Sequence, residues 1–212
     1  MPAEEKGYIQ FACDWERSDP TTDPRAAGVI VWRNRLARIG LIGIYPDGIG
    51  FGNISTRINH HEFLITGTAT GAIAEIGPEH LCRVTAADIT SNRVRCRGPV
   101  PASSESLSHA AVYQAVADAG VVIHVHHLGI WQAYRNKLPT TDDRAEAGTP
   151  AMGEAIAQLA AEVGGIPGGV FIMGGHREGW MAFGRDADEA GQRVLQVWEA
   201  WCQNNQLAVK ND

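Results

Sequence analysis

The sequence predicts one α+β domain in which helices pack on a mainly antiparallel sheet. Apolar residues recur at helical spacing in several segments, and short apolar runs bounded by glycine turns indicate strands between them. Strands and helices do not alternate strictly, as they would around a parallel sheet. A chain of 212 residues, 44% of them hydrophobic, is long enough to bury the core of one such domain.

The first long helix is expected from about Pro24 to one of the glycines in Gly40–Gly43. Apolar residues recur every three or four positions over Val29–Ile39, and proline suits a first helical turn. Before this helix, Tyr8–Cys13 is compatible with a short strand. Ser18–Pro24, rich in Pro, Thr and Asp, indicates a loop.

The middle of the chain predicts strands joined by glycine turns. The glycine-rich segment Asp47–Arg57 leads into a strand, and Phe63–Thr66 is a second strand followed by a turn that ends at Gly71. Pro78–Leu81 indicates one helical turn, and Val84–Val94 indicates a pair of strands. These elements supply the first part of the predicted sheet.

The second half of the chain predicts three longer helices, one short helix and three further strands. The helices are expected over Glu105–Ala117, Ile130–Tyr134, Thr149–Ala161 and Asp188–Asn204. The strands are expected over Val121–His126, Val170–Met173 and Trp180–Phe183. Glycine-rich connections are expected over Gly164–Gly169 and Gly175–Gly179.

Composition excludes several classes of partner. The formal net charge is -6 and there is no dense basic stretch, which argues against nucleic acid. No apolar run approaches the roughly 20 residues that span a membrane, and the charged N-terminus lacks the apolar region of a secretory signal. The four cysteines are scattered without a C-x-x-C pair, so we expect reduced thiols in a soluble, cytoplasmic protein.

His124 and His126 are the first candidates for chemistry. Successive side chains of a strand point to opposite faces, so these two share a face while Val125 points away. With Cα atoms about 6–7 Å apart, their imidazoles can converge on one metal ion. Two hydrogen-bonded structural histidines are the alternative. His127 faces the other way, which favours a supporting or structural role.

His176 is the best candidate for a third ligand. A catalytic zinc usually has three protein ligands and one open position. His176 lies in the loop Gly174–Gly179 between two predicted strands, where glycines let the backbone approach an ion. An ordinary loop histidine is the alternative. His60, His61 and His80 lie in polar turns and are predicted as surface residues.

Glu105 opens the helix that precedes the histidine strand. A carboxylate in a first turn gains from the helix dipole, so Glu105 is a stabilising cap, a general base or a fourth metal ligand. His109 lies one turn later on the same face, where it either touches Glu105 or simply packs. Ser103 and Ser104 precede this helix, where hydroxyls and free N–H groups bind an anion or simply cap the helix.

The order of these motifs resembles that of the class II aldolase/adducin family, which includes L-fuculose-phosphate aldolase. The motifs are Gly52-Asn-Ile-Ser55, Leu64-Ile-Thr66 with its glycine turn, Ser103-Ser-Glu105, His109-Ala-Ala-Val-Tyr113, His124-Val-His126 and His176. The resemblance runs from about residue 25 to 200. It predicts residues 1–24 as an N-terminal extension and residues 25–212 as the class II aldolase-like domain.

The resemblance implies a three-layer α/β/α domain around a central antiparallel sheet, assembled as a homotetramer. It implies that His124, His126 and His176 bind Zn2+, or another divalent metal such as Mn2+, Co2+ or Fe2+, and that Glu105 is the catalytic acid/base. The residues that it implies for holding the substrate phosphate are Asn53, Thr68, Thr70, Gly71, Ser103 and Ser104.

The chemistry implied by the resemblance is retro-aldol cleavage of a sugar phosphate or related hydroxy-ketone. The metal acts as a Lewis acid that stabilises the enediolate, and Glu105 transfers the proton. The scaffold is shared with epimerases and dehydratases, so an epimerase, dehydratase or decarboxylase is the alternative. A non-enzymatic assembly module, as in adducin, is a third hypothesis that the retained histidines and Glu105 disfavour.

The sequence departs from the aldolase pattern in three places. The glycine turn after Thr66 is longer, so which of its residues meets phosphate stays open. The third histidine is followed by Arg-Glu-Gly where His-Gly is common, which makes Glu178 a competing ligand. Asp143 stands near the place of a catalytic tyrosine, and a C-terminal tyrosine is missing. These changes affect the substrate end of the site.

Overall fold

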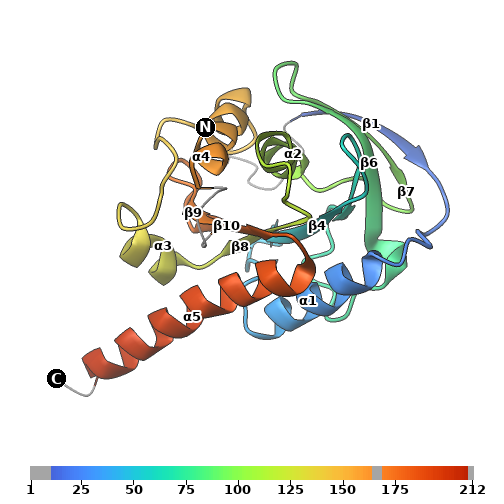
Figure 1. Ribbon diagram of the computed structural model, residues 1–212. Helices are drawn as coiled ribbons and strands as arrows, with labels where there is room; N and C mark the ends of the chain where they lie inside the picture. Colours follow the sequence, from blue (N-terminus) through green and yellow to red (C-terminus); the bar gives the residue numbers. More distant parts are fainter. Residues whose placement is uncertain (1–10, 164–168, 210–212) are drawn as a thin grey trace.

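A central sheet lies between two layers of helices in the computed structural model, which describes residues 11–163 and 169–209 (Figure 1). Helices α2 (Ser106–Ala115) and α4 (Pro150–Val163) cover one face of the sheet. Helices α1 (Ala26–Arg38) and α5 (Ala187–Val209) cover the other face, and the short α3 (Leu128–Tyr134) packs beside α5. The predicted three-layer α/β/α architecture is confirmed.

The large sheet has eight strands in the order β1-β7-β6-β5-β4-β8-β10-β9. Every neighbouring pair is antiparallel except β1 and β7, which are parallel. This confirms the prediction of a mainly antiparallel sheet. The strands are β1 (Ala12–Arg17), β4 (Asn53–Arg57), β5 (Phe63–Thr66), β6 (Leu81–Asp88), β7 (Arg93–Gly98), β8 (Val121–His126), β9 (Val170–Ile172) and β10 (Gly179–Gly184).

The alternation of side chains along β8 divides the core into two clusters. Ile123 and Val125 join the cluster beneath α1 and α5, whereas Val122 joins the cluster beneath α2 and α4. Because side chains two residues apart share a face, His124 and His126 point to the same side as Val122. The strand therefore carries both histidines toward the layer that contains α2.

Most predicted elements are present, with ends shifted by at most five residues. Pro78–His80 forms a 3-10 turn, η1, and the strand pair predicted over Val84–Val94 lies around a turn at residues 89–92, in β6 and β7. A small hairpin of β2 (Gly43–Ile44) and β3 (Gly50–Phe51) was not predicted from the sequence. Strands of two residues carry too short an alternation to be recognised.

Two predicted elements fall partly outside the described residues. The predicted strand Tyr8–Cys13 reaches into residues 1–10, and the predicted turn Gly164–Gly169 covers 164–168. Within the described part, β1 runs further than expected and adds to the edge of the sheet beside β7. The four cysteines, whose positions are all described, are free thiols. No described helix combines the length and apolar character needed to cross a bilayer.

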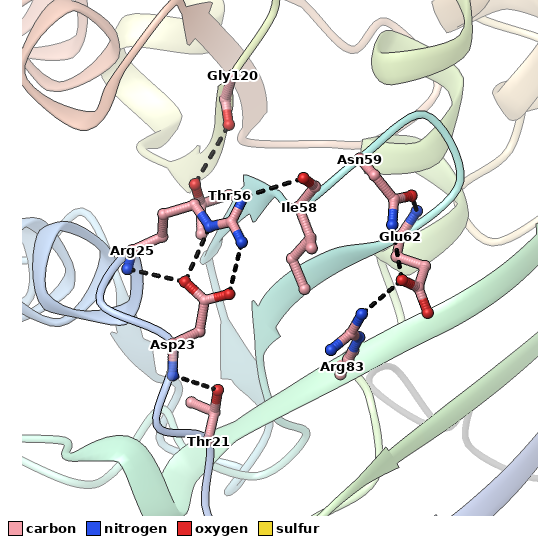
Figure 2. A network of polar contacts seen from close by, with 9 residues as sticks. All are labelled: Thr21, Asp23, Arg25, Thr56, Ile58, Asn59, Glu62, Arg83 and Gly120. Carbon is pink, nitrogen blue, oxygen red and sulfur yellow. Dashed lines mark hydrogen bonds and ion pairs between the residues drawn. The ribbon is translucent and has the colours of Figure 1, made fainter.

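A polar network joins the start of α1 to the β4–β5 hairpin (Figure 2). Arg25 pairs with Asp23 at 2.6 Å and also donates to the backbone oxygen of Ile58 at 2.9 Å. At the end of the turn that joins β4 to β5, Glu62 pairs with Arg83 of β6 at 2.5 Å. The Asp23–Arg25 pair is partly exposed, so it contributes little by itself. The ion pair orients Arg25 so that its guanidinium reaches the backbone of the hairpin.

Candidate metal centre

Three histidines from two parts of the chain form one compact cluster. His124 and His126 come from β8, and His176 comes from the turn between β9 and β10. Their ring centroids are separated by 4.7 Å (124 to 126), 5.0 Å (124 to 176) and 4.7 Å (126 to 176). One ligand nitrogen from each lies within 4.8 Å of the others. The structure therefore brings together the pair predicted from strand spacing and the third candidate, His176.

The nitrogen atoms fit a divalent ion such as zinc. Nε2 of His124 and Nε2 of His126 are 3.1 Å apart. Two nitrogen ligands of a tetrahedral zinc, each about 2.0–2.1 Å from the ion, lie about 3.3 Å apart. Burial, and then the neighbouring imidazoles, hold the pKa of His124 and of His126 well below the usual value. Both rings are therefore neutral and can offer a lone pair.

A glycine on the neighbouring strand leaves room for these rings. Gly179 pairs with His126 across the antiparallel strands β10 and β8. A Cβ atom at residue 179 would lie 3.0 Å from Nε2 of His124 and 3.1 Å from Cγ of His176. Any larger residue would crowd the face where the imidazoles meet. The glycine that follows His176 by three positions therefore helps to keep this face open.

Glu105 lies at the edge of the histidine cluster, at the N-cap position of α2. Its Oε1 atom is 3.7 Å from Nδ1 of His176, and its Oε2 atom accepts a hydrogen bond of 2.6 Å from the Ser108 hydroxyl. The carboxylate makes no capping hydrogen bond to the helix backbone. This position suits a general base or a fourth ligand better than a helix cap.

A buried chain of hydrogen bonds begins at Asn53, which pairs with His124 across β4 and β8. The Asn53 amide donates to Ser103 Oγ at 2.9 Å, and its oxygen accepts from Nε2 of His109 at 2.6 Å. Nδ1 of His109 accepts from the Ser55 hydroxyl at 2.7 Å, and Ser55 is bonded to Tyr113 at 2.7 Å. Burial lowers the pKa of His109 to about 3, so this ring is neutral.

His109 makes neither of the two contacts that its place on the helix suggested. Residues four apart share a helix face, so His109 was expected either to touch Glu105 or simply to pack. The carboxylate instead bonds to Ser108, and His109 bonds to Asn53 and Ser55 of β4. The partners of His109 are set by the packing of α2 on the sheet, which helical spacing cannot predict.

The turn after β5 holds the other predicted phosphate residues. The Thr70 hydroxyl donates to the backbone oxygen of Gly67 at 2.8 Å, so it stabilises the turn itself. Gly71 packs against the backbone of Gly43, where a Cβ atom would lie 2.1 Å from the Gly43 oxygen. Thr68 is half-buried at the tip of the turn. Before α2, Ser104 is half-buried and makes no side-chain hydrogen bond within the described part of the chain.

Arg33 supports this turn and was not predicted from the sequence. It is buried on α1, with 1% of its surface exposed. Its guanidinium donates to the backbone oxygens of Thr70, at 2.6 Å, and of Ile73. The available signal was a basic residue four positions after Val29, on the apolar face of a helix.

Tyr45 and Glu178 also belong to the site. The Tyr45 hydroxyl lies 2.9 Å from Nδ1 of His126 and donates to Oε2 of Glu178 at 2.7 Å. Burial, and then the Glu178 carboxylate, raise the pKa of Tyr45, so its hydroxyl keeps its proton. Glu178 was expected to compete as a metal ligand. Its carboxylate instead bonds to Tyr45, which contacts the candidate ligand His126. Tyr45 lies in the unrecognised hairpin.

The remaining candidates lie outside the cluster. His127 caps α3, where its Nδ1 accepts from the Ile130 N–H at 3.2 Å, and it packs edge-on against Trp201. Asp143 forms an ion pair with Arg135. His60 and His61 are exposed and His80 is half-buried, accepting from the Gly77 N–H at 3.0 Å.

The sequence matches the model of the class II aldolase and adducin N-terminal domain over residues 47–204. The chain belongs to the class II aldolase and adducin family. Among curated proteins, none is similar to it in sequence. The matched span contains the three histidines, Glu105 and the buried chain from Asn53 to Tyr113.

Solved structures share the fold at low sequence identity. L-fuculose-1-phosphate aldolase from Thermus thermophilus is 20% identical, with a TM-score of 0.61, covering 88% of this chain and 95% of that one. A sugar-phosphate aldolase from Thermotoga maritima is 15% identical, with a TM-score of 0.64 and coverages of 87% and 94%. YgbL from Klebsiella pneumoniae, for which aldolase, epimerase and decarboxylase activities are all considered, is 16% identical, with a TM-score of 0.65 and coverages of 86% and 89%.

Proposed function

We propose that this protein is a divalent-metal-dependent lyase of the class II aldolase type. Its reaction would be the retro-aldol cleavage of a phosphorylated sugar or a related hydroxy-ketone. The observation that carries the proposal is the meeting of three histidines with a carboxylate, Oε1 of Glu105 lying 3.7 Å from His176. Three imidazole ligands leave a position open for substrate, as catalytic metal sites require.

The metal would be held by His124, His126 and His176. Zinc suits the imidazole donors best, and Mn2+, Co2+ or Fe2+ are the other candidates. When bound, the ion supplies Lewis-acid polarisation of the substrate carbonyl. The two strand histidines are neutral rings and do not act as acids, because the pKa of His124 and of His126 lies well below the usual value.

Proton transfer would fall to Glu105. The Ser108 hydroxyl fixes its Oε2 atom and leaves Oε1 on the side of the histidines. A carboxylate oriented in this way can hold the proton exchanged at the reacting carbon. The side chain is 9% exposed, so solvent competes little for that proton.

The anionic end of the substrate would bind near the start of α2. Ser103 Oγ accepts hydrogen bonds from Asn53 at 2.9 Å and from the Glu105 N–H at 3.4 Å, so its own proton is free to be donated. Ser104 offers a second hydroxyl, and Thr68 a third. Hydroxyls at a helix N-terminus suit a phosphate group. Thr70 and Gly71 would support this end by shaping the turn.

Metal analysis followed by a substrate screen tests the proposal. We expect about one divalent ion per chain and release of an aldehyde from at least one ketose phosphate. NMR analysis of the products separates cleavage from epimerisation, dehydration and decarboxylation on the same site. A metal-loaded protein that changes no member of a broad panel would overturn the proposal. If the purified protein holds no metal and chelators leave its stability unchanged, an adducin-like assembly role is favoured.

We also propose a homotetramer in the cytoplasm, with no nucleic-acid or membrane partner. Membership of the family supports the tetramer, and composition offers no basic stretch for nucleic acid. Light scattering coupled to size-exclusion chromatography measures the assembly directly. A monomer at micromolar concentration would contradict this part of the proposal and leave the metal site untouched.

A further inference from the structure

Tyr45 is fixed in place by both its backbone and its ring. Its N–H donates to the oxygen of Ile49 at 2.8 Å, and its own oxygen accepts from the Gly48 N–H at 2.9 Å. The ring packs against Phe51, with centroids 4.5 Å apart, and Phe51 in turn stacks on His126 at 5.5 Å. The β2–β3 hairpin thus holds the hydroxyl at one position behind a proposed metal ligand.

The directions of the two hydrogen bonds of this hydroxyl follow from its chemistry. An ionised carboxylate only accepts, so the Tyr45 hydroxyl donates its single proton to Oε2 of Glu178, 2.7 Å away. The hydroxyl oxygen must then accept from Nδ1 of His126, at 2.9 Å. Hydrogen bonds therefore run in one direction, from His126 through Tyr45 to Glu178.

A neutral imidazole carries one proton, so a proton on Nδ1 leaves the lone pair of His126 on Nε2. Nε2 is the atom that lies 3.1 Å from Nε2 of His124, on the side where the three rings meet. We propose that Tyr45 is a positioning residue which, together with Glu178, holds His126 in the tautomer that binds the metal. This inference rests on the proposed function in that the three histidines are taken as the ligands.

The other two histidines lack such a partner. Nδ1 of His124 and Nδ1 of His176 are buried without a hydrogen-bond partner in residues 11–163 and 169–209. No hydrogen bond to Nδ1 therefore fixes the tautomer of either ring. His126 is the ligand whose geometry and protonation are set in advance, and it would be the anchor of the site.

The backbone at Glu178 supports the same conclusion. Its φ angle is +73°, a left-handed conformation that residues with a side chain rarely adopt. Strained backbone of this kind gathers at functional sites, where surrounding contacts hold it. The contact observed here is the hydrogen bond to Tyr45, and the Glu178 backbone oxygen also accepts from the His127 N–H at 3.0 Å. The strained turn presents the carboxylate to the hairpin.

Zinc affinity gives the first test. The dissociation constant would be measured by chelator competition on the wild-type, Tyr45→Phe, Glu178→Gln and, as the matched control, Tyr134→Phe. Tyr134 lies on α3, and its hydroxyl makes no hydrogen bond among the described residues. Loss of a partner behind a ligand typically weakens metal binding about 10- to 100-fold, so we expect that loss in Tyr45→Phe. Glu178→Gln should lose less, because its amide oxygen still accepts.

The tautomer of His126 gives the second test and needs no metal. Long-range 1H–15N spectra of the metal-free protein report which ring nitrogen carries the proton. We expect the proton of His126 on Nδ1 in the wild-type and in Tyr134→Phe, and a mixture of tautomers in Tyr45→Phe. A wild-type His126 protonated on Nε2, or unchanged zinc affinity in a folded Tyr45→Phe variant, would overturn the inference. A wild-type protein that binds no metal but shows the Nδ1 tautomer would overturn the proposed function alone.

Discussion

The Oε1 atom of Glu105 lies 3.7 Å from Nδ1 of His176, while the other carboxylate oxygen is held by Ser108. That separation is longer than a hydrogen bond, so the carboxylate stands beside the histidine cluster without being tied to it. A small movement would bring Glu105 either to a bound ion or to a substrate proton. A substitution of Glu105 is therefore needed to distinguish a general base from a fourth metal ligand.

Replacing Glu105 by glutamine should lower kcat by about 10²- to 10⁴-fold, the usual effect of losing a general acid–base group. The amide keeps the size of the side chain and its contact with Ser108 but cannot carry the proton. If Glu105 is only the base, the metal content of Glu105→Gln should equal that of the wild-type. Loss of metal together with activity would identify it as a fourth ligand.

The variant Ser108→Ala provides the control for Glu105→Gln. It keeps the carboxylate and removes the hydrogen bond of 2.6 Å that orients it. We expect a smaller fall in kcat than in Glu105→Gln, with unchanged metal content. Wild-type turnover in Glu105→Gln, measured with a substrate found by screening, would exclude Glu105 from the chemistry.

The metal-free protein should lose stability as the pH falls below neutral, because His109 is buried as a neutral ring. Burial lowers the pKa of His109 to about 3, whereas an imidazole in the unfolded chain titrates near about 6.5. Between these values the unfolded chain binds the proton and the folded chain does not. The free energy of unfolding therefore falls as the pH falls, by about 1.4 kcal/mol per pH unit for one histidine, and this effect vanishes above the unfolded pKa.

Urea unfolding in the presence of a chelator, at about pH 7 and at about pH 5, measures this slope. His124 and His126, whose pKa values are also lowered by burial, should make the wild-type slope steeper than one histidine explains. The variant His109→Gln should show a shallower slope than the wild-type. An equal slope in both proteins would mean that His109 does not resist protonation in the folded state.

The sequence predicted the parts of the site that depend on local geometry. The period of two along β8 was sufficient to place His124 and His126 on one face, and the helix start made Glu105 a candidate cap, base or ligand. Bringing His176 to the pair depends on the pairing of β8 with β10, which the order of family motifs implied and the spacing alone did not. The central sheet was likewise predictable from its short apolar runs.

The parts that escaped prediction depend on contacts between distant segments. His109 bonds to Asn53 and Ser55 of β4, more than fifty residues earlier in the chain, instead of to its helical neighbour. Tyr45 reaches His126 from a hairpin whose strands have two residues each. Arg33 donates hydrogen bonds to backbone oxygens, and the pattern of side chains in the sequence does not predict such contacts. Such partners become visible only when the chain is folded.

Replacing Arg33 by leucine should destabilise the protein by about 2–4 kcal/mol. The buried guanidinium donates to the oxygens of Thr70 and Ile73, and each buried oxygen left unpaired costs about 1–3 kcal/mol. Arg38→Leu is the control, because Arg38 and its partner Glu75 are both 68% exposed. Urea unfolding should show a loss below about 1 kcal/mol for the control. Equal losses would contradict the support of the turn by Arg33.

Replacing Gly71 by alanine should displace the hairpin that carries Tyr45. The new Cβ atom would lie 2.1 Å from the oxygen and 3.0 Å from the carbonyl carbon of Gly43, and both are backbone atoms of β2. No flexible side chain can absorb this clash, so the hairpin must move or the turn must distort. Overpacking of this kind costs about 1–3 kcal/mol of stability.

Gly50→Ala, on the facing strand β3, is the matched control, because its Cβ atom would meet its nearest neighbours at an ordinary 3.7 Å. Since the hairpin sets the position of the Tyr45 hydroxyl, Gly71→Ala should weaken zinc binding in the same direction as Tyr45→Phe, whereas Gly50→Ala should not. Combining Gly71→Ala with Tyr45→Phe separates the causes. If the hairpin acts through Tyr45, the double variant should bind zinc no more weakly than Tyr45→Phe alone. Independent, additive losses would mean that the turn at Gly71 reaches the metal by another route.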